Sequence, residues 1–192
     1  MKIGRLLLRL TVGGFFFGHG TQKLFGWFGG HGLEATAGMF DGMGMRPGKR
    51  NAVAAGVAEA GGGAALALGL ATPLAAGTLT SVMLTAIHRV HLKNGPWATN
   101  GGYEYNAVLI AAVLALAEVG PGDLSLDHVL GIERTGPGWA ILAAAMGAVG
   151  AIGAHQAAAA YPAPPAPPAA ADTDSGSAPA DEATEATATP SQ

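Results

Sequence analysis

A small set of polar side chains stands out in an otherwise apolar chain as candidates for chemistry or ligand binding. They are Arg9, His19, Lys23, Glu59, His88, His91, Tyr103 and Glu104. Charged residues make up only 12% of the 192 residues, and hydrophobic residues make up 49%. A carboxylate inside such an apolar stretch is costly unless it is paired or protonated. We therefore expect Glu59 to have a partner, and His19, Lys23 and His88 are the candidates.

Two interpretations of a paired Glu59 remain open. A buried carboxylate beside histidine can exchange a proton near neutral pH, and a polar pocket could bind a small polar or quinone-like molecule. Alternatively, an ion pair could only fix the register of two helices. His88 and His91 lack a dense His and Asp neighbourhood, so no metal site is predicted. The chain has no cysteine, which excludes thiol catalysis and cysteine-ligated clusters.

The elements that would position these residues are predicted membrane-spanning helices. A span needs roughly 20 apolar residues. Four core spans are predicted, and a charge-free segment rich in alanine and glycine is predicted to be the fifth; these five stretches are 6–25, 51–71, 74–92, 103–119 and 138–160. Residues 33–45 could form a short amphipathic helix at the membrane surface. A further short helix is predicted over 124–132, with Ser125 or Asp123 as its N-terminal cap.

The predicted fold class is all-α, a membrane bundle of four core transmembrane helices plus a fifth, with a disordered C-terminal tail. The bundle would occupy residues 1–135, the fifth helix 136–160, and the Pro/Ala-rich acidic tail 161–192. The basic residues near the N-terminus favour an N-terminus on the cytoplasmic side. No dense basic block is present, so the expected partner is a lipid bilayer and not nucleic acid.

Antiparallel spans would bring most of the candidate residues to one half of the membrane. The residues expected in that half are His19, Lys23, Glu59, His88, Arg89, His91, Lys93, Asn100, Tyr103, Glu104 and Tyr105. The opposite end is predicted to be sparse, with Arg5, Arg9, Thr72 and Glu118. At about 100° per residue, Thr78, Ser81, Thr85 and His88 share one stripe of their helix. Ala52, Ala55, Gly56 and Gly63 share the face of Glu59, and such small residues would let a neighbouring helix come close.

Several ordered segments together resemble the DoxX family of small bacterial membrane proteins over residues 3 to about 131. They are the stretch from Arg9 that ends in HGTQKLFG (19–26), GLEATA (32–37), AE followed by GGG (58–63), NGGYEYN (100–106) and GPGDLSLD (120–127). The resemblance implies a multi-pass four-helix bundle in the bacterial plasma membrane and a redox-linked role. Some relatives are linked to thiosulfate–quinone oxidoreduction and others to redox-stress complexes.

The resemblance leaves the reaction open, including whether the protein is an enzyme. It implies a membrane subunit that contacts a quinone, as cofactor or ligand, or a soluble oxidoreductase, and it is compatible with a homo-oligomer. A direct thiosulfate activity is not expected, because a chain without cysteine lacks one obvious way of handling sulfur. The alternative is a non-catalytic carrier or transporter of a small solute, or a membrane scaffold.

Overall fold

The computed structural model describes residues 3–161, and this part of the chain is helical with no strand. Five long helices form its body: α1 (Ile3–Phe25), α3 (Gly48–Leu68), α4 (Thr72–Ala86), α5 (Glu104–Val119) and α7 (Pro137–Ala159). The connections hold α2 (Gly32–Gly42), α6 (Leu126–Val129), the π-helical turn η2 (Ile87–His91) and the 3-10 turns η1 (Trp27–Gly29), η3 (Leu92–Asn94) and η4 (Ala98–Asn100). The predicted all-α class is confirmed, whereas the predicted tail beyond residue 161 lies outside the described residues.

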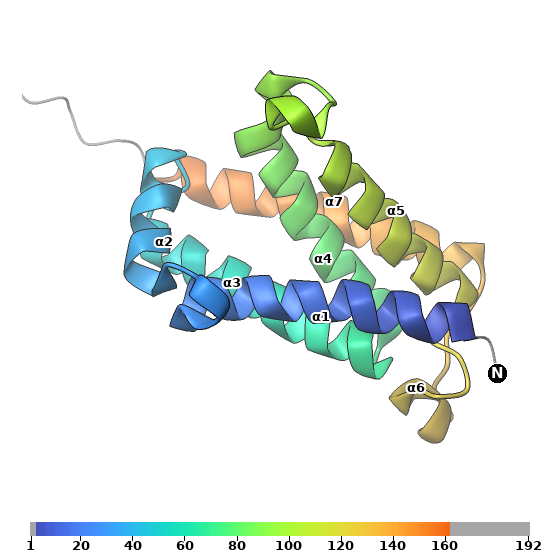
Figure 1. Cartoon of the computed structure of the whole chain (residues 1–192). Helices are drawn as coiled ribbons and strands as arrows, with labels where there is room; N and C mark the ends of the chain where they lie inside the picture. Colours follow the sequence, from blue (N-terminus) through green and yellow to red (C-terminus); the bar gives the residue numbers. More distant parts are fainter. Residues whose placement is uncertain (1–2, 162–192) are drawn as a thin grey trace, which may run out of the picture.

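The long helices converge at one end of the bundle and diverge at the other. Helix α1 packs mainly on α3, while α4 packs on α7, α5 and α3. In Figure 1 the α1–α3 pair and the α4–α5 pair meet near the N-terminus of α1 and spread apart toward α2. Helix α2 contacts α3 at the open end, where Phe40, Met45 and Ala52 form a small core with Ala158 of α7. The arrangement leaves space between the helix pairs at the α2 end.

Glycine allows α1 and α3 to approach each other closely. A Cβ atom on Gly13 would lie 2.6 Å from the carbonyl oxygen of Gly63, and one on Gly63 would lie 2.6 Å from the carbonyl oxygen of Gly13. A Cβ on Gly56 would lie 2.6 Å from Cγ of Leu24 on α1. The prediction that the small residues on the Glu59 face admit a neighbouring helix is therefore confirmed for Gly56 and Gly63.

The close approach of α1 and α3 predicts an unequal response to valine at two nearby glycines. A Cβ on Gly20 would meet the backbone of Gly56 and Ala60, whereas nothing lies within 4 Å of one on Gly18. Gly20→Val should cost about 1–3 kcal/mol more than Gly18→Val, because backbone atoms cannot move aside as a flexible side chain can. Thermal unfolding in detergent, followed by near-UV circular dichroism, would measure the difference. Equal losses would contradict this account of the helix contact.

Helix α7 is packed into the bundle through small residues on both sides of its contact with α4. A Cβ on Gly77 would lie 3.1 Å from the carbonyl oxygen of Ala143, and one on Gly147 would lie 2.5 Å from Cγ2 of Thr80. Ala143 also belongs to the main core, whose largest members are Phe16, Leu66, Leu79, Met83 and Leu116. The C-terminal helix is therefore an integral part of the bundle.

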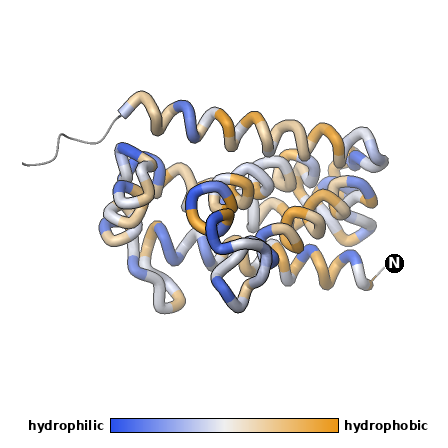
Figure 2. Tube along the Cα trace, turned by 90° about the horizontal axis from the view of Figure 1, so that it is seen from above, coloured by the Kyte–Doolittle hydropathy of each residue, from blue (hydrophilic) through white to orange (hydrophobic). Residues whose placement is uncertain are grey.

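Two of the described helices, α3 and α7, are long and apolar enough to cross a membrane by length and composition. Helix α1 has 23 residues but carries Arg5, Arg9 and Lys23. Helices α4 and α5 have 15 and 16 residues, a rise of only about 23 Å against roughly 30 Å of hydrocarbon. The predicted total of four spans plus a fifth therefore stays a prediction. Figure 2 shows α7 apolar along most of its length, with hydrophilic residues gathered in α2 and the connections.

The ends of the helices agree with the predicted segments to within a few residues, with one exception. The predicted span 74–92 ends as an α-helix at Ala86 and continues as the π-helical turn η2. The predicted short helix over 124–132 is present as the single turn α6. Of its two predicted caps, Ser125 fills the role, because its Oγ accepts a hydrogen bond from the backbone N–H of His128 at 3.2 Å.

Candidate functional site

Glu59 and Lys23 form an ion pair between α3 and α1. Nζ of Lys23 donates to Oε2 of Glu59 over 2.5 Å, and the two side chains are 24% and 4% exposed, respectively. The glycines described above bring the two helices close enough for this contact, because they remove side chains from the α1–α3 contact. The expectation that Glu59 has a partner is confirmed, and the partner among the three candidates is Lys23.

The ion pair lies in the wall of a cavity of about 480 Å³, which we call the Glu59 cavity. It occupies the diverging end of the bundle and is lined by residues of α1, α2, α3, α4, η2, α5 and α7. Its larger apolar lining residues are Phe16, Met39, Phe40, Met43, Met45, Met83 and Leu109. Its polar lining includes His19, Lys23, Asn51, Glu59, Arg89, His91, Tyr105 and Asn106. Apolar walls with a few polar groups are typical of sites for small organic ligands.

Four of the predicted site residues come together in this cavity: His19, Lys23, Glu59 and His91. Nδ1 of His19 lies 3.0 Å from Oε1 of Gln22, one turn further along α1. Nδ1 of His91 lies 2.7 Å from the carbonyl oxygen of Gly101, which ties η2 to the loop before α5. Both histidine rings are therefore held by local contacts rather than by Glu59.

The other predicted site residues lie away from the cavity. His88 is exposed and stacks edge-on against His155 of α7, with ring centroids 4.4 Å apart. The angle of about 100° per residue, which placed His88 in one stripe with Thr78, Ser81 and Thr85, does not apply here because η2 is π-helical. Arg89 and His91 therefore line the cavity, and His88 does not. Oε2 of Glu104 accepts a hydrogen bond from the backbone N–H of Ala98 at 2.9 Å. Tyr103 occupies the cap position of α5.

Several cavity residues were not among the sequence candidates. Asn106 donates from Nδ2 to the sulfur of Met83 at 3.3 Å, and Asn51 donates from Nδ2 to the carbonyl oxygen of Met45 at 3.0 Å. Asn106 had a signal in the sequence, because it directly follows Tyr105, which was expected in this half of the bundle, in the NGGYEYN segment. The three methionines at positions 39, 43 and 45 offered another, because flexible thioethers suit adaptable binding surfaces.

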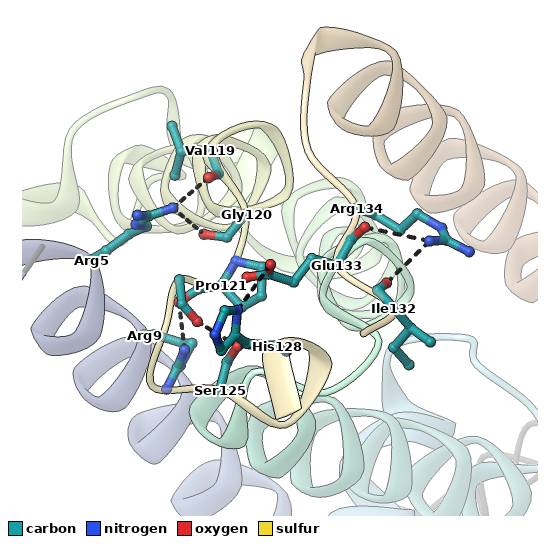
Figure 3. Close-up of polar contacts among 11 residues, drawn as sticks. Arg5, Arg9, Val119, Gly120, Pro121, Ser125, His128, Ile132, Glu133 and Arg134 are labelled. Carbon is teal, nitrogen blue, oxygen red and sulfur yellow. Dashed lines mark hydrogen bonds and ion pairs between the residues drawn. The ribbon is translucent and has the colours of Figure 1, made fainter. Parts of the chain in front are cut away.

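The converging end of the bundle is not sparse in polar groups, and that prediction is wrong. Arg9 is 2% exposed. It donates from Nε to the carbonyl oxygen of Ala67 at 2.9 Å, from Nη1 to Pro121 at 2.6 Å and from Nη2 to Leu124 at 2.5 Å. Figure 3 shows Arg9 beneath the segment that follows α5, close to Pro121 and Ser125. These partners are backbone carbonyls, which a comparison of side chains along helix faces does not include.

A buried aspartate completes this end of the bundle. Asp127 is 1% exposed and accepts hydrogen bonds from the backbone N–H groups of Ala71 and Thr72 and from Oγ1 of Thr72, at 2.7, 3.0 and 2.9 Å. It thereby satisfies donors at the start of α4, where a carboxylate is favourable. The contacts of Arg9 and Asp127, which we call the Arg9 network, lie at the end of the bundle opposite Glu59.

Within residues 3–161, no three His, Asp or Glu side chains lie close enough to hold a metal ion. The groups that the Glu59 cavity offers to a ligand are therefore hydrogen-bonding and charged side chains set in apolar walls. Such groups orient a polar head, while the walls bury an apolar body.

Comparison with known proteins gives one family match. Residues 4–92 match the model of the DoxX family. None of the curated proteins and none of the solved structures compared with the chain matches it. The matched segment contains Lys23, Glu59 and Arg89, which are the charged residues of the cavity, and also His91. Helices α5, α6 and α7 lie beyond it. The resemblance to the DoxX family is therefore confirmed over residues 4–92.

Proposed function

We propose that this protein is a multi-pass membrane protein whose Glu59 cavity binds a quinone or a quinone-like amphipathic molecule, as part of a redox-linked membrane system. The observation that carries the proposal is a buried ion pair in the wall of an otherwise apolar cavity. A solute with a polar head and an apolar ring or chain complements both features.

Membrane insertion is supported by the outer surface of the bundle. Large apolar side chains face outward on α1 and α7, among them Leu7, Phe15, Ile141 and Val149. Patches of this kind suit contact with lipid and are rare on monomeric soluble proteins. We propose that all five long helices cross the plasma membrane of a bacterium, with residues 1–135 as the four-helix unit and 136–160 as an added span.

Ionisable groups inside a membrane bundle favour a functional role for the site. Burial of an ion pair is not a reliable source of stability, because desolvation offsets the attraction between the charges. Intramembrane carboxylates and lysines commonly mark ligand or proton pathways. Lys23 and Glu59 therefore supply a head-group contact at the cavity wall, and a soluble oxidoreductase could exchange electrons with the bound quinone.

A carrier or transporter of a small solute is the second candidate. The observation that favours it is the position of the cavity between two helix pairs that diverge toward one end (Figure 1). Movement of one pair toward the other would enclose a solute.

Quinone binding by the purified protein in lipid nanodiscs would test the proposal. We expect 2-methyl-1,4-naphthoquinone to raise the thermal midpoint of the wild type, because a ligand that binds only the folded state stabilises it. Ala55→Trp should weaken this binding at least roughly tenfold by filling space at the cavity wall. Val57→Trp is the matched control, because Val57 lies on the exposed side of the same helix.

The alternatives give different results in the same assay. Stabilisation by polar solutes and none by quinones would favour the carrier. Equal quinone binding by wild type and Ala55→Trp would place the site outside the cavity and contradict the proposal.

A further inference from the structure

Arg89 is a cation of the Glu59 cavity that makes no hydrogen bond or ion pair with any residue in 3–161. Its Nε atom is buried and has no hydrogen-bond partner. The ion pairs in this part of the chain join other residues: Lys23 with Glu59, Lys49 with Glu34, and His128 with Glu133. A guanidinium carries five N–H donors, and leaving buried donors without acceptors is unfavourable.

The charges of the cavity do not balance. Glu59 is the only acid among the lining residues, and Lys23 already neutralises it. Among the lysine, arginine and glutamate side chains of the lining, Arg89 leaves one positive charge. In surroundings of low dielectric constant, an unbalanced charge attracts an opposite charge much more strongly than it would in water.

Arg89 is placed to meet the head of a bound molecule. It extends from η2 toward the turn after α2, since a Cβ atom on Gly44 would lie 3.6 Å from its Nη1. On α1 and α5, Phe16 and Leu109 are the lining residues nearest the end where the helices converge, and Met83 lies on α4 one turn before η2. With its head group at Arg89, an elongated amphipathic occupant could therefore extend its apolar body past Met83 toward Phe16 and Leu109.

We infer that Arg89 binds an anionic oxygen on the head group of the cavity's occupant, while the apolar body lies against Phe16, Met83 and Leu109. This inference rests on the proposed function and defines the ligand class of the same site. An arginine suits it better than a lysine would, because its planar fork donates two parallel hydrogen bonds to an oxyanion. An ionised hydroxyquinone and the carboxylate of an acyl chain share this chemistry.

Two matched pairs of probes test the inference with the full-length protein in nanodiscs. The first pair is 2-hydroxy-1,4-naphthoquinone, which is ionised at neutral pH, and the neutral 2-methyl-1,4-naphthoquinone. The second pair is octanoate and octanol. We expect the wild type to bind the anion of at least one pair roughly tenfold more tightly than its neutral analogue, the effect of one charged hydrogen bond. The pair whose anion binds more tightly than its neutral analogue shows whether the anionic oxygen belongs to a quinone or to an acyl chain.

Substitutions then assign the preference to Arg89. Arg89→Gln should abolish the preference for the anion, and Arg89→Lys should retain part of it. Lys93→Gln should leave it unchanged, because Lys93 is an exposed cation one turn further on that does not line the cavity. Circular dichroism checks the fold of each variant, and if Arg89→Gln does not fold, the wild-type preference and Arg89→Lys decide.

The inference and the proposed function fail in different ways. Equal affinity of the wild type for anion and neutral analogue would overturn the role of Arg89 and leave the quinone site standing. A preference that persists in Arg89→Gln would also overturn it. Failure of all four probes to bind would remove both.

Discussion

Arg9→Met is expected to lower the free energy of unfolding by about 3–5 kcal/mol. The substitution removes three hydrogen bonds from a charged donor that is 2% exposed. It also leaves the buried carbonyl oxygen of Pro121 without its arginine partner, which adds a desolvation cost. The segment 120–124 would then lose the hydrogen bonds that join Pro121 and Leu124 to α1.

Arg5→Met is the matched control for Arg9→Met. Arg5 lies one turn earlier on α1 and donates from Nη1 to the carbonyl oxygen of Val119 at 2.7 Å, in an exposed contact. We expect a loss of only about 1 kcal/mol for that variant. Detergent-solubilised protein unfolded with increasing denaturant would give both values. Losses of similar size would mean that the Arg9 network is no more important than a surface contact.

Lys23→Met is expected to destabilise the protein by about 3–5 kcal/mol, because it leaves the buried carboxylate of Glu59 without its counter-charge. The double variant Lys23→Met/Glu59→Gln should recover most of that loss, because neither partner then carries a buried charge. A double-mutant cycle of unfolding free energies would measure the coupling between the two residues. Additive losses in the cycle would contradict an ion pair between α1 and α3.

The same double variant separates the two interpretations of the pair. If Lys23 and Glu59 only fix the register of two helices, a stable double variant should bind quinone as the wild type does. If they contact the head group, the double variant should fold and insert but bind at least about tenfold more weakly. Glu59→Gln alone should likewise abolish a redox-linked phenotype without affecting membrane insertion. An unchanged phenotype would favour the structural interpretation.

Much of the fold could be predicted because glycine and proline interrupt long apolar stretches. The ends of α1, α3, α5 and α7 agree with the predicted segments for that reason. That Glu59 has a partner was also predictable, because a carboxylate in an apolar helix requires one, although the sequence left His19, Lys23 and His88 as equal candidates. The segments that carry the DoxX resemblance include Lys23 and Glu59, and the family match over 4–92 confirms the resemblance there.

The rest could not be predicted, for identifiable reasons. Arg9 binds carbonyl oxygens of residues that lie up to 115 positions away, and every residue has a carbonyl, so the sequence carries no mark of these partners. His88 was assigned to the site from the angular spacing of side chains in an α-helix, and that spacing applies only up to the start of η2. Arg89 was expected in the polar half but was not chosen as a site residue, whereas the structure places it in the lining of the cavity.

The contrast between the two ends of the bundle has a mechanical consequence. The Arg9 network ties α1, α3, the start of α4 and the segment after α5 together, while the other end is spread apart around a cavity. A rearrangement that admits a ligand would then separate the helix pairs at the cavity end, with a hinge at residues 120–124 and the greatest displacement at α2 and η2. Entry and release would be governed by the α2 end, at the opposite end of the bundle from the Arg9 network.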